Sequence, residues 1–350
     1  MNRLLSMLIK FLAQLTRQLY GVVLWFFAMI TMICSVLSIV GFNAGWLPEL
    51  SSHFRLVYLG VQLAFLIYVL IGKGLFQLTN RASTLLIITN LILMGINFSA
   101  FIPYLQTKPH IKDSQIVRKI KILHINVLGI NSNTKPVIDL IQQTKPDILT
   151  LAEYNSRWQN ALKQSGVLQR FSSSYVVKYG NDGIYSTIPF QPKDVQVDYV
   201  EPGKDSTLQL HMVIEKVPVT ILLIHPRPPV KPHWYERNKN HFAYLERRWP
   251  EWSDHILLIG DLNTSPWSYT FRHFMSQTKL QDSQLGQGIQ PSWPVLIPER
   301  GIENLPPLIP IDHILHSHCF STLSRKTGPR IGSDHLPVIS ELALLKKSTQ

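Results

Sequence analysis

Cysteine is scarce in this sequence, and its scarcity excludes some kinds of site before any motif is considered. Cys34 and Cys319 are the only cysteines in 350 residues, and Cys34 lies in an apolar N-terminal region. The polar part of the chain therefore has no disulfide framework and no cysteine-based metal site. Two cysteines are compatible with either side of a membrane, so they do not decide the compartment. The sequence also lacks internal repeats and low-complexity tracts.

Acidic residues are few relative to basic ones. The chain has 34 Lys and Arg against 22 Asp and Glu, a net charge of +12 at pH 7. This balance favours anionic partners, namely nucleic acid, an anionic membrane surface or phosphate-bearing substrates, and does not choose among them. The mean hydropathy is slightly positive, which is high for a soluble protein and indicates membrane segments.

Charge is absent from three long apolar runs in the N-terminal third, Tyr20–Phe42, Leu56–Gly72 and Thr84–Leu105. A spanning helix needs roughly 20 residues, with a lower limit of about 17. We therefore predict a membrane anchor over residues 1–105, with three transmembrane helices at about 20–42, 56–72 and 84–105. A cleaved signal peptide fits the first run less well, because the run starts late and two more follow it. A buried or re-entrant helix is the alternative for the second run.

Positive charges in the short loops orient this anchor. Arg3, Lys10 and Arg17 precede the first run, and Lys73 and Arg81 separate the second from the third. Basic loops stay on the cytoplasmic side, so three crossings place the C-terminal part outside. Basic residues after the third run argue mildly against this, but charge in a long translocated domain counts for less. We predict an integral membrane protein with an extracytoplasmic C-terminal domain.

The C-terminal domain is predicted over residues 119–350, after a polar linker at 106–118. It begins with a strand at Lys119–Val127, a helix at Thr134–Thr144 and a buried strand at Asp147–Glu153. This β-α-β order favours a layered α/β domain. A Gly-rich turn followed by a short strand is predicted within Tyr175–Phe190. Hydrophobic patterns predict five further strands and one further helix. The strands lie at 208–214, 217–224, 256–259, 310–315 and 337–344, and the helix lies at 234–249.

Polar side chains recur at the ends of these strands. They are Asn126, Glu153, His225, Asp261 with Asn263, and Asp334 with His335. Each has an ordinary explanation by itself: Asp261 and Asn263 fit an Asx-turn, and a single Glu or His is usually a solvated or satisfied polar residue. Their recurrence predicts one catalytic site, because catalytic groups concentrate in loops at strand ends.

The chemistry of these side chains indicates a hard divalent cation. They offer carboxylate and amide oxygens with imidazoles, and the sequence has no HExxH motif. Such a set favours Mg²⁺ or Mn²⁺ over Zn²⁺. A carboxylate-held cation with two histidines suits hydrolysis of a phosphate ester, because the metal neutralises charge on the phosphate while other groups orient water and protonate the leaving oxygen.

A series of motifs resembles the endonuclease/exonuclease/phosphatase superfamily, whose members include deoxyribonuclease I, apurinic endonucleases and sphingomyelinases. In chain order the motifs are HINV, LAE, DGIYSTIP, IHPRPP, GDLNTSPW, PIDHIL and GSDHLPV. The resemblance covers Lys119 to Leu344. It implies a four-layer α/β sandwich, in which two central, mostly antiparallel sheets are flanked by helices and the site lies at one edge.

The resemblance also implies roles for individual residues. The metal would be bound by Asn126, Glu153 and Asp334. The catalytic groups would be His225, Asp261, Asn263, Asp312 and His335. Among these, Asp261 and Asn263 would orient the attacking water, His335 would be the general base or a phosphate ligand, and His225 would stabilise the phosphate or help protonate the leaving group. Asp312 would hydrogen-bond His335.

Three positions depart from the family's usual motifs. GDLN replaces GDFN, Ser186-Thr187 replaces a Ser-Arg pair, and Ala152 replaces Gln before Glu153. The first and third departures keep the polar groups, whereas the second removes a possible phosphate contact.

The apolar runs, HPRPP and PSWP resemble a membrane-anchored bacterial branch of the superfamily, some of whose members are linked to lipid-pyrophosphate hydrolysis. The resemblance implies an integral protein of the bacterial inner membrane. The leading hypothesis is a metal-dependent phosphoesterase acting outside the cytoplasm on a lipid-linked phosphate. The alternatives are an extracytoplasmic nuclease and a non-catalytic membrane scaffold. The predicted partners are a phosphate-bearing substrate, lipid-linked or nucleic acid, and the lipid bilayer, with no obligate protein partner.

Overall fold

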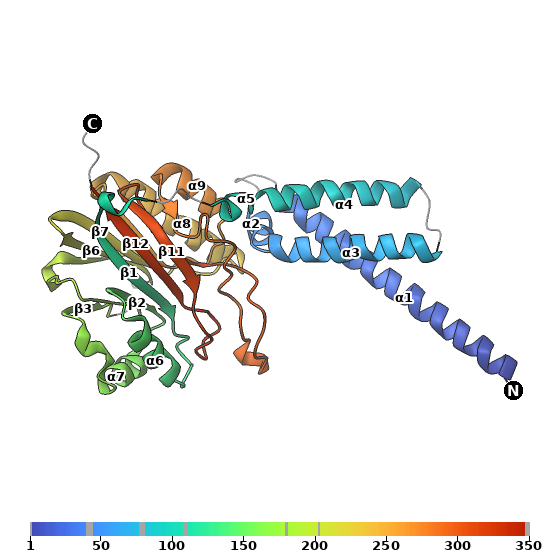
Figure 1. Ribbon diagram of the computed structural model, residues 1–350, viewed down its shortest axis with the longest axis horizontal. Helices are drawn as coiled ribbons and strands as arrows, with labels where there is room; N and C mark the ends of the chain where they lie inside the picture. Colours follow the sequence, from blue (N-terminus) through green and yellow to red (C-terminus); the bar gives the residue numbers. More distant parts are fainter. Residues whose placement is uncertain are drawn as a thin grey trace. The chain divides into compact units, whose positions relative to one another are not determined.

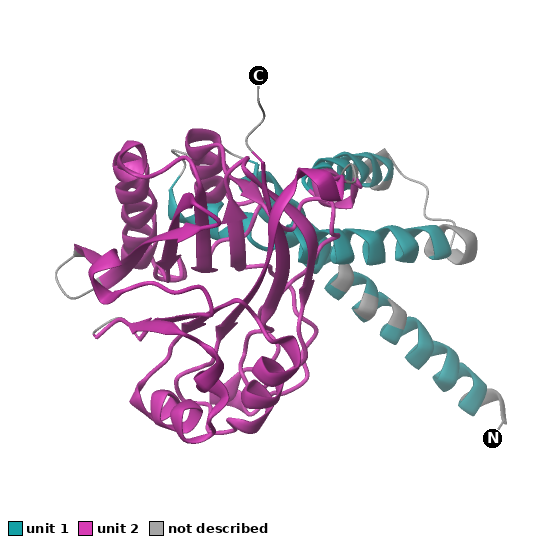
Figure 2. Cartoon of the chain, turned by 60° about the vertical axis from the view of Figure 1, so that its left-hand side comes forward, with its two compact units in different colours: residues 1–100 teal, residues 101–350 magenta. Residues whose placement is uncertain are grey.

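The chain forms two compact units, Met1–Ala100 and Phe101–Gln350 (Figure 2). The computed structural model describes residues 2–39, 45–76, 81–107, 111–178, 181–201 and 204–346. Residues 40–42 of the first predicted span and 108–110 of the predicted linker lie outside the described residues.

The first unit is entirely helical in its described part. Its helices are α1 (Asn2–Leu37), α2 (Trp46–Ser52), α3 (Arg55–Phe76) and α4 (Arg81–Ser99). Helices α1, α3 and α4 pack around a small apolar core that includes Ala28, Phe65 and Leu93 (Figure 1). Their sequences are rich in leucine and isoleucine and contain few helix-breaking residues, which favours helix formation. Large apolar side chains remain exposed along α1, α3 and α4.

One helix in the described residues is long and apolar enough to cross a membrane, the 33-residue stretch Leu5–Leu37 of α1. A second span results if α2 and α3, which are bent by 67° at their junction, count as one broken span. The third predicted run contains a shorter apolar helix, Ile87–Ser99. Helix α1 begins well before residue 20, and α4 ends at Ser99 rather than Leu105. A helix such as α1, near the N-terminus, also has the properties of a signal sequence.

The second unit contains two six-stranded sheets (Figure 1). The first has the order β11-β12-β1-β2-β4-β3, and the second has the order β5-β6-β7-β8-β10-β9. The strands of the first sheet are β1 (Ile116–Asn126), β2 (Ile148–Ala152), β3 (Ser173–Val176), β4 (Gly183–Ser186), β11 (Phe320–Thr327) and β12 (Val338–Leu345). Those of the second are β5 (Val195–Glu201), β6 (Lys204–Ile214), β7 (Val217–Ile224), β8 (Ile256–Asp261), β9 (Gln281–Asp282) and β10 (Asp312–His316).

Helices cover the outer faces of both sheets. They are α6 (Lys135–Thr144), α7 (Ser156–Gln164), α8 (Pro232–Arg248) and α9 (Tyr269–Thr278). The short helix α5 (Ile102–Leu105) precedes the first strand of the unit. Short 3₁₀ helices lie at Asp113–Gln115, Val167–Arg170, Pro192–Asp194, Trp249–Glu251 and Pro298–Arg300.

Three apolar clusters define the layers. Ile122 and Leu223 belong to a cluster shared by the inner faces of the two sheets. Trp158 of α7 packs on the outer face of the first sheet, and Phe242 of α8 with Phe274 of α9 packs on the second. The predicted four-layer α/β sandwich is therefore confirmed. Each sheet is mostly antiparallel and has one parallel pair, β1 with β2 and β7 with β8.

Strand direction and register bring the predicted site residues to one edge. Parallel β1 and β2 end together, with Asn126 opposite Ala152. In the second sheet, β10 begins where antiparallel β8 ends, so Asp312 is paired with Asp261. Because parallel strands present their carboxyl ends at the same edge, side chains distant in sequence converge there.

Candidate active site

The turn after β8 places Asp261 at the centre of the site. A Cβ on Gly260 would lie 1.9 Å from the carbonyl oxygen of Ile224, so only glycine allows β7 and β8 to approach this closely. The backbone N–H of Asn263 donates to Asp261 Oδ1 at 3.0 Å, and Asn263 adopts a left-handed φ of 49°. The structure therefore contains the Asx-turn. The turn uses Asp261 Oδ1, so Oδ2 faces the other site residues.

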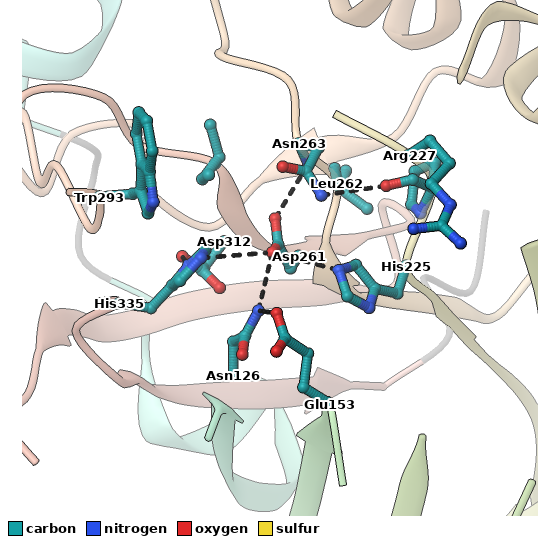
Figure 3. Close-up of polar contacts among 12 residues, drawn as sticks. Asn126, Glu153, His225, Arg227, Asp261, Leu262, Asn263, Trp293, Asp312 and His335 are labelled. Carbon is teal, nitrogen blue, oxygen red and sulfur yellow. Dashed lines mark hydrogen bonds and ion pairs between the residues drawn. The ribbon is translucent and has the colours of Figure 1, made fainter. Parts of the chain in front are cut away.

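Three side chains surround Asp261 Oδ2 (Figure 3). Asn126 Nδ2 donates to it at 3.1 Å. His225 Nε2 lies at 3.4 Å and His335 Nε2 at 3.6 Å. These groups come from both sheets, and Asp261 is almost completely buried. The structure thus brings three of the predicted residues to one carboxylate oxygen of a fourth, Asp261.

Glu153 reaches the same place from the end of β2. It adopts a left-handed φ of 56°, which turns the chain out of the strand. Its Oε1 accepts from Asn126 Nδ2 at 3.1 Å, and its Oε2 accepts from the backbone N–H of Gly129 at 2.8 Å. Asn126 Oδ1 in turn accepts from the N–H of Leu128 at 3.0 Å. Asn126 therefore connects Glu153 to Asp261.

Asp312 orients His335. The Nδ1 atom of His335 lies 2.8 Å from Asp312 Oδ2, and both side chains are buried. The loop before β12 is held by Ser333, whose hydroxyl donates to the carbonyl of Asn126 at 2.7 Å and accepts from the N–H of His335 at 3.1 Å. The imidazole is thereby fixed with Nε2 toward Asp261.

Asp334 lies beside this group and contacts the aromatic loop. Its Oδ2 accepts from the indole Nε1 of Trp293 at 3.1 Å and is 4.0 Å from His335 Nε2. Its Oδ1 is buried and has no hydrogen-bond partner among the described residues. Asn263, in contrast, turns its amide away, donating from Nδ2 to the carbonyl of Pro226 at 3.0 Å.

Two further residues of the site have no counterpart among those predicted. Asp182 lies in the loop before β4 and its side chain is buried. Its Oδ1 atom is 3.9 Å from His225 Nδ1, and its Oδ2 atom accepts a hydrogen bond from the Ser206 hydroxyl at 3.4 Å. His124, on β1, faces Asp312. The two residues lie inside the motifs DGIYSTIP and HINV, respectively. Each contacts a site residue that is distant in the sequence, so the spacing of residues along the chain does not indicate that it belongs to the site.

The buried charges shift one another's pKa values. Burial lowers the pKa of His335, but Asp312 and Asp261 outweigh it and raise the pKa to about 10. Burial likewise lowers the pKa of His225, and the hydrogen bond and charge of Asp261 raise it to about 9. Burial by itself would raise the pKa of Asp261, but the positive charge of His335 outweighs burial and holds that pKa below its ordinary value. The two imidazoles are therefore cationic at neutral pH.

Two acids of the site have raised pKa values. Burial raises the pKa of Asp182 to about 7 and also raises that of Asp334, and the charges of Glu153 and Asp261 add to both effects. A divalent cation would relieve this repulsion, so the residues fit such a group. The ligand atoms are mainly oxygens, which Mg²⁺ and Mn²⁺ prefer.

Two sets of residues could hold the cation. Asp261, Asp312 and His335 offer ligand atoms that lie within 4.8 Å of one another. In this set, however, Asp312 and His335 already bind each other at 2.8 Å. Glu153 and Asp334 provide a second set, in which Asp334 Oδ1 has no hydrogen-bond partner among the described atoms. Each set therefore keeps one carboxylate oxygen without a hydrogen-bond partner among the described residues, Asp312 Oδ1 in the first and Asp334 Oδ1 in the second.

A two-sheet sandwich whose edge gathers carboxylates, an amide and imidazoles is typical of metal-dependent hydrolases. The sequence matches the Endonuclease/Exonuclease/phosphatase family over residues 123–335, and the chain belongs to this family. Members of the family are metal-dependent phosphoesterases or nucleases, so the protein is a phosphoric ester hydrolase.

Solved structures show the same fold. A family protein from Bacteroides thetaiotaomicron is 16% identical, with a TM-score of 0.54 over 65% of this chain and 98% of that chain. A family protein from Beutenbergia cavernae is 18% identical, with a TM-score of 0.50 over 65% and 72%. Truncated TDP2 from Caenorhabditis elegans is 15% identical, with a TM-score of 0.50 over 64% and 98%. No curated protein matches the sequence.

Proposed function

We propose that the protein is a membrane-anchored phosphoesterase that uses Mg²⁺ or Mn²⁺ to hydrolyse a lipid-linked phosphate ester or pyrophosphate outside the cytoplasm. The observation that carries this proposal is the convergence of Asn126, Glu153, His225 and His335 around Asp261 at one edge of the sandwich. The N-terminal unit supplies the argument for the membrane.

Glu153 and Asp334, with the amide of Asn126, would hold the cation. When bound, it supplies positive charge that stabilises the phosphate as its charge develops. Asn126 donates to two carboxylates in this structure, which positions Glu153 and Asp261 relative to each other.

The remaining residues perform the proton transfers. Water attacks phosphorus while the bond from phosphorus to the leaving oxygen breaks. Asp261, whose pKa lies below its ordinary value, stays ionised and accepts the proton of the water. His225, with a pKa of about 9, is protonated and donates its proton to the leaving oxygen. Asn263 holds Asp261 in place through its backbone N–H.

His335 acts as a phosphate ligand in this scheme. The sequence leaves two roles open for it, general base and phosphate ligand. A pKa of about 10 keeps the imidazole protonated at neutral pH, so it offers a positive charge and no free base. Asp312 keeps that charge directed toward the site through the Nδ1 contact.

The first unit has the distribution of polar and apolar side chains that a lipid environment favours. Leu63, Ile67 and Leu91 are exposed on its surface. Ser35 and Asn97 are fully buried and hydrogen-bonded at 2.9 Å between α1 and α4. Apolar exteriors with polar contacts between helices are expected of helices packed in a bilayer.

Purified full-length protein in detergent, assayed with a polyprenyl pyrophosphate and with plasmid DNA, tests this proposal. We expect Mg²⁺- or Mn²⁺-dependent release of phosphate from the lipid and little DNA cleavage. Cleavage of DNA alone would reject the lipid substrate and favour the nuclease alternative. Arg227 and Arg237, which could contact a nucleic acid, are paired with Asp205 at 3.7 and 2.7 Å. Their charges are thus partly compensated.

Location requires a separate measurement. Cysteine introduced at exposed Lys163 on α7 of the intact protein should react with a membrane-impermeant maleimide added to whole cells. Labelling only after cell lysis would place the domain in the cytoplasm and reject the proposed orientation.

A further inference from the structure

His124 is a buried imidazole for which the proposed reaction has no role. It lies in the middle of the sandwich on β1, and its side chain has no exposed surface. Its Nε2 atom faces Asp312 Oδ1 at 3.4 Å, and its Nδ1 atom lies 2.9 Å from the hydroxyl of Thr150. Asp312 belongs to the opposite sheet, so this contact crosses between the sheets.

The two facing atoms depend on each other. His124 Nε2 and Asp312 Oδ1 face each other in an ion-pair contact at 3.4 Å, and neither atom has a hydrogen-bond partner in the described part of the chain. A buried polar atom without a partner costs free energy. An apolar residue would fill a core position on β1 without that cost, as Ile122 does. The contact with the Asp312 carboxylate therefore accounts for the presence of a histidine at this core position.

Other contacts fix the backbone of Asp312 independently. Arg325 Nη2 donates to the carbonyl of Asp312 at 2.9 Å, and the backbone N–H of Asp312 donates to the hydroxyl of Ser292 at 3.4 Å. The contact with His124 therefore concerns the carboxylate alone. With His335 at Oδ2 and His124 at Oδ1, both oxygens of Asp312 face an imidazole nitrogen.

We propose that His124 is a positioning residue that fixes the Asp312 carboxylate and, through it, the orientation of His335. The Thr150 hydroxyl holds the imidazole of His124 at Nδ1, which keeps Nε2 facing Asp312 Oδ1. A carboxylate held at both oxygens cannot rotate, so the Nδ1–H of His335 stays bound and its Nε2 stays directed at Asp261. This role rests on the proposed function of His335.

Two substitutions of similar size separate this role from core packing. The amide nitrogen of Gln reaches the place of imidazole Nε2, so His124→Gln retains a donor to Asp312. His124→Met keeps the volume without a donor. We expect His124→Met to lower kcat about tenfold to a hundredfold, the range for outer-shell partners, with little change in KM. His124→Gln should restore most of the loss.

The Asp312→Asn background tests the pathway. If His124 acts through the carboxylate, His124→Met should cost little further activity there, since coupled residues are not additive. Equal losses in the Gln and Met variants, or a full additional loss in the Asp312→Asn background, would show that His124 only packs the core. If His124→Met does not fold, His124→Asn serves in its place, because its shorter amide points toward Thr150.

Nuclear magnetic resonance of the full chain, labelled with ¹⁵N-histidine in detergent micelles, gives a readout that needs no substrate. The hydrogen-bonded Nδ1–H proton of His335, identified by its loss in His335→Ala, should move or broaden in His124→Met and return in His124→Gln. An unchanged resonance in His124→Met would overturn the inference. If the wild type hydrolyses no phosphate substrate, the proposed function fails, and this resonance still decides the role of His124.

Discussion

Each unit contains a buried cluster of polar side chains, and the two clusters differ in kind. In the first, the buried node at Ser35, Gln62 and Asn97 consists of neutral hydroxyl and amide groups that hydrogen-bond across three helices. In the second, the buried groups around Asp261 and His335 are titratable and shift one another's pKa values.

The difference follows from what surrounds each set. Neutral interhelical hydrogen bonds need no counter-ion, and they suit a bundle whose exterior is apolar. Charged groups gathered at a sheet edge are expensive to bury unless cations or an anionic substrate complete them. The polar node of the first unit therefore needs no ion, although Asn97 Oδ1 has no hydrogen-bond partner among the described residues. The charged groups of the C-terminal unit are suited to binding a metal and a phosphate. Perturbing each set should have different consequences.

Removal of divalent cations should have the largest effect. Because Glu153, Asp261 and Asp334 repel one another without a cation, we expect EDTA to reduce phosphate release to background and Mg²⁺ or Mn²⁺ to restore it. The apparent melting temperature should rise with added metal, since a ligand that binds the folded state stabilises it. Full activity after exhaustive chelation would contradict a metal-dependent mechanism.

Replacement of single site residues should come next. Glu153→Gln and His335→Ala should each lower kcat/KM about 1,000-fold or more, as expected when a group essential to the transition state is removed. The matched control is Glu215→Gln, which alters an exposed acid paired only with Arg118 among the described residues. Circular dichroism should show folded protein in all three. Unchanged turnover in both site variants would refute the assignment.

Sequence alone predicts these residues because strand ends are readable in it. A buried run such as Ile256–Ile259 followed by Gly260 indicates that a strand is about to end. Asp261 follows Gly260 and is the last residue of β8. The pattern does not show which strands pair. The pairing of Asp312 with Asp261 depends on the register of β10 with β8, and sequence indicates that only through resemblance to a family.

Helices with weak apolar patterns escape prediction for a different reason. Helices α7 and α9 are short and largely polar, so each contains too few apolar residues to show a clear helical pattern. Their clearest signals are the caps: Asn155 accepts from the N–H of Trp158, and Ser268 accepts from the N–H of Phe271. Asn and Ser are common in turns as well as at helix starts, so the caps identify a helix only once the structure is known.

Asp182→Asn should raise stability in a pH-dependent way. The folded-state pKa of about 7 exceeds the ordinary 3.8, so ionisation of Asp182 costs stability. That cost is absent below pH 3.8, grows as pH rises and is complete above about 7. We expect the Asn variant to be more stable by on the order of 1–4 kcal/mol at pH 8 and by less at pH 5.

Chemical unfolding at the two pH values measures this difference. Activity should fall in the same variant, because His225 loses a neighbouring acid. A gain of equal size at both pH values would mean that the substitution acts through packing and not through the charge.

Asn97→Leu, in the first unit, should have the smallest effect. It removes the donor to Ser35 and Gln62, and an interhelical hydrogen bond within a bilayer is worth about 0.6–2 kcal/mol. Thermal unfolding in micelles should show a modest loss, while kcat/KM for a soluble phosphate substrate stays unchanged. Ile96→Leu, at an exposed neighbour, is the control. A gain in stability would mean that apolar packing, and not the polar node, joins these helices, and the contrast between the two units would then be one of composition alone.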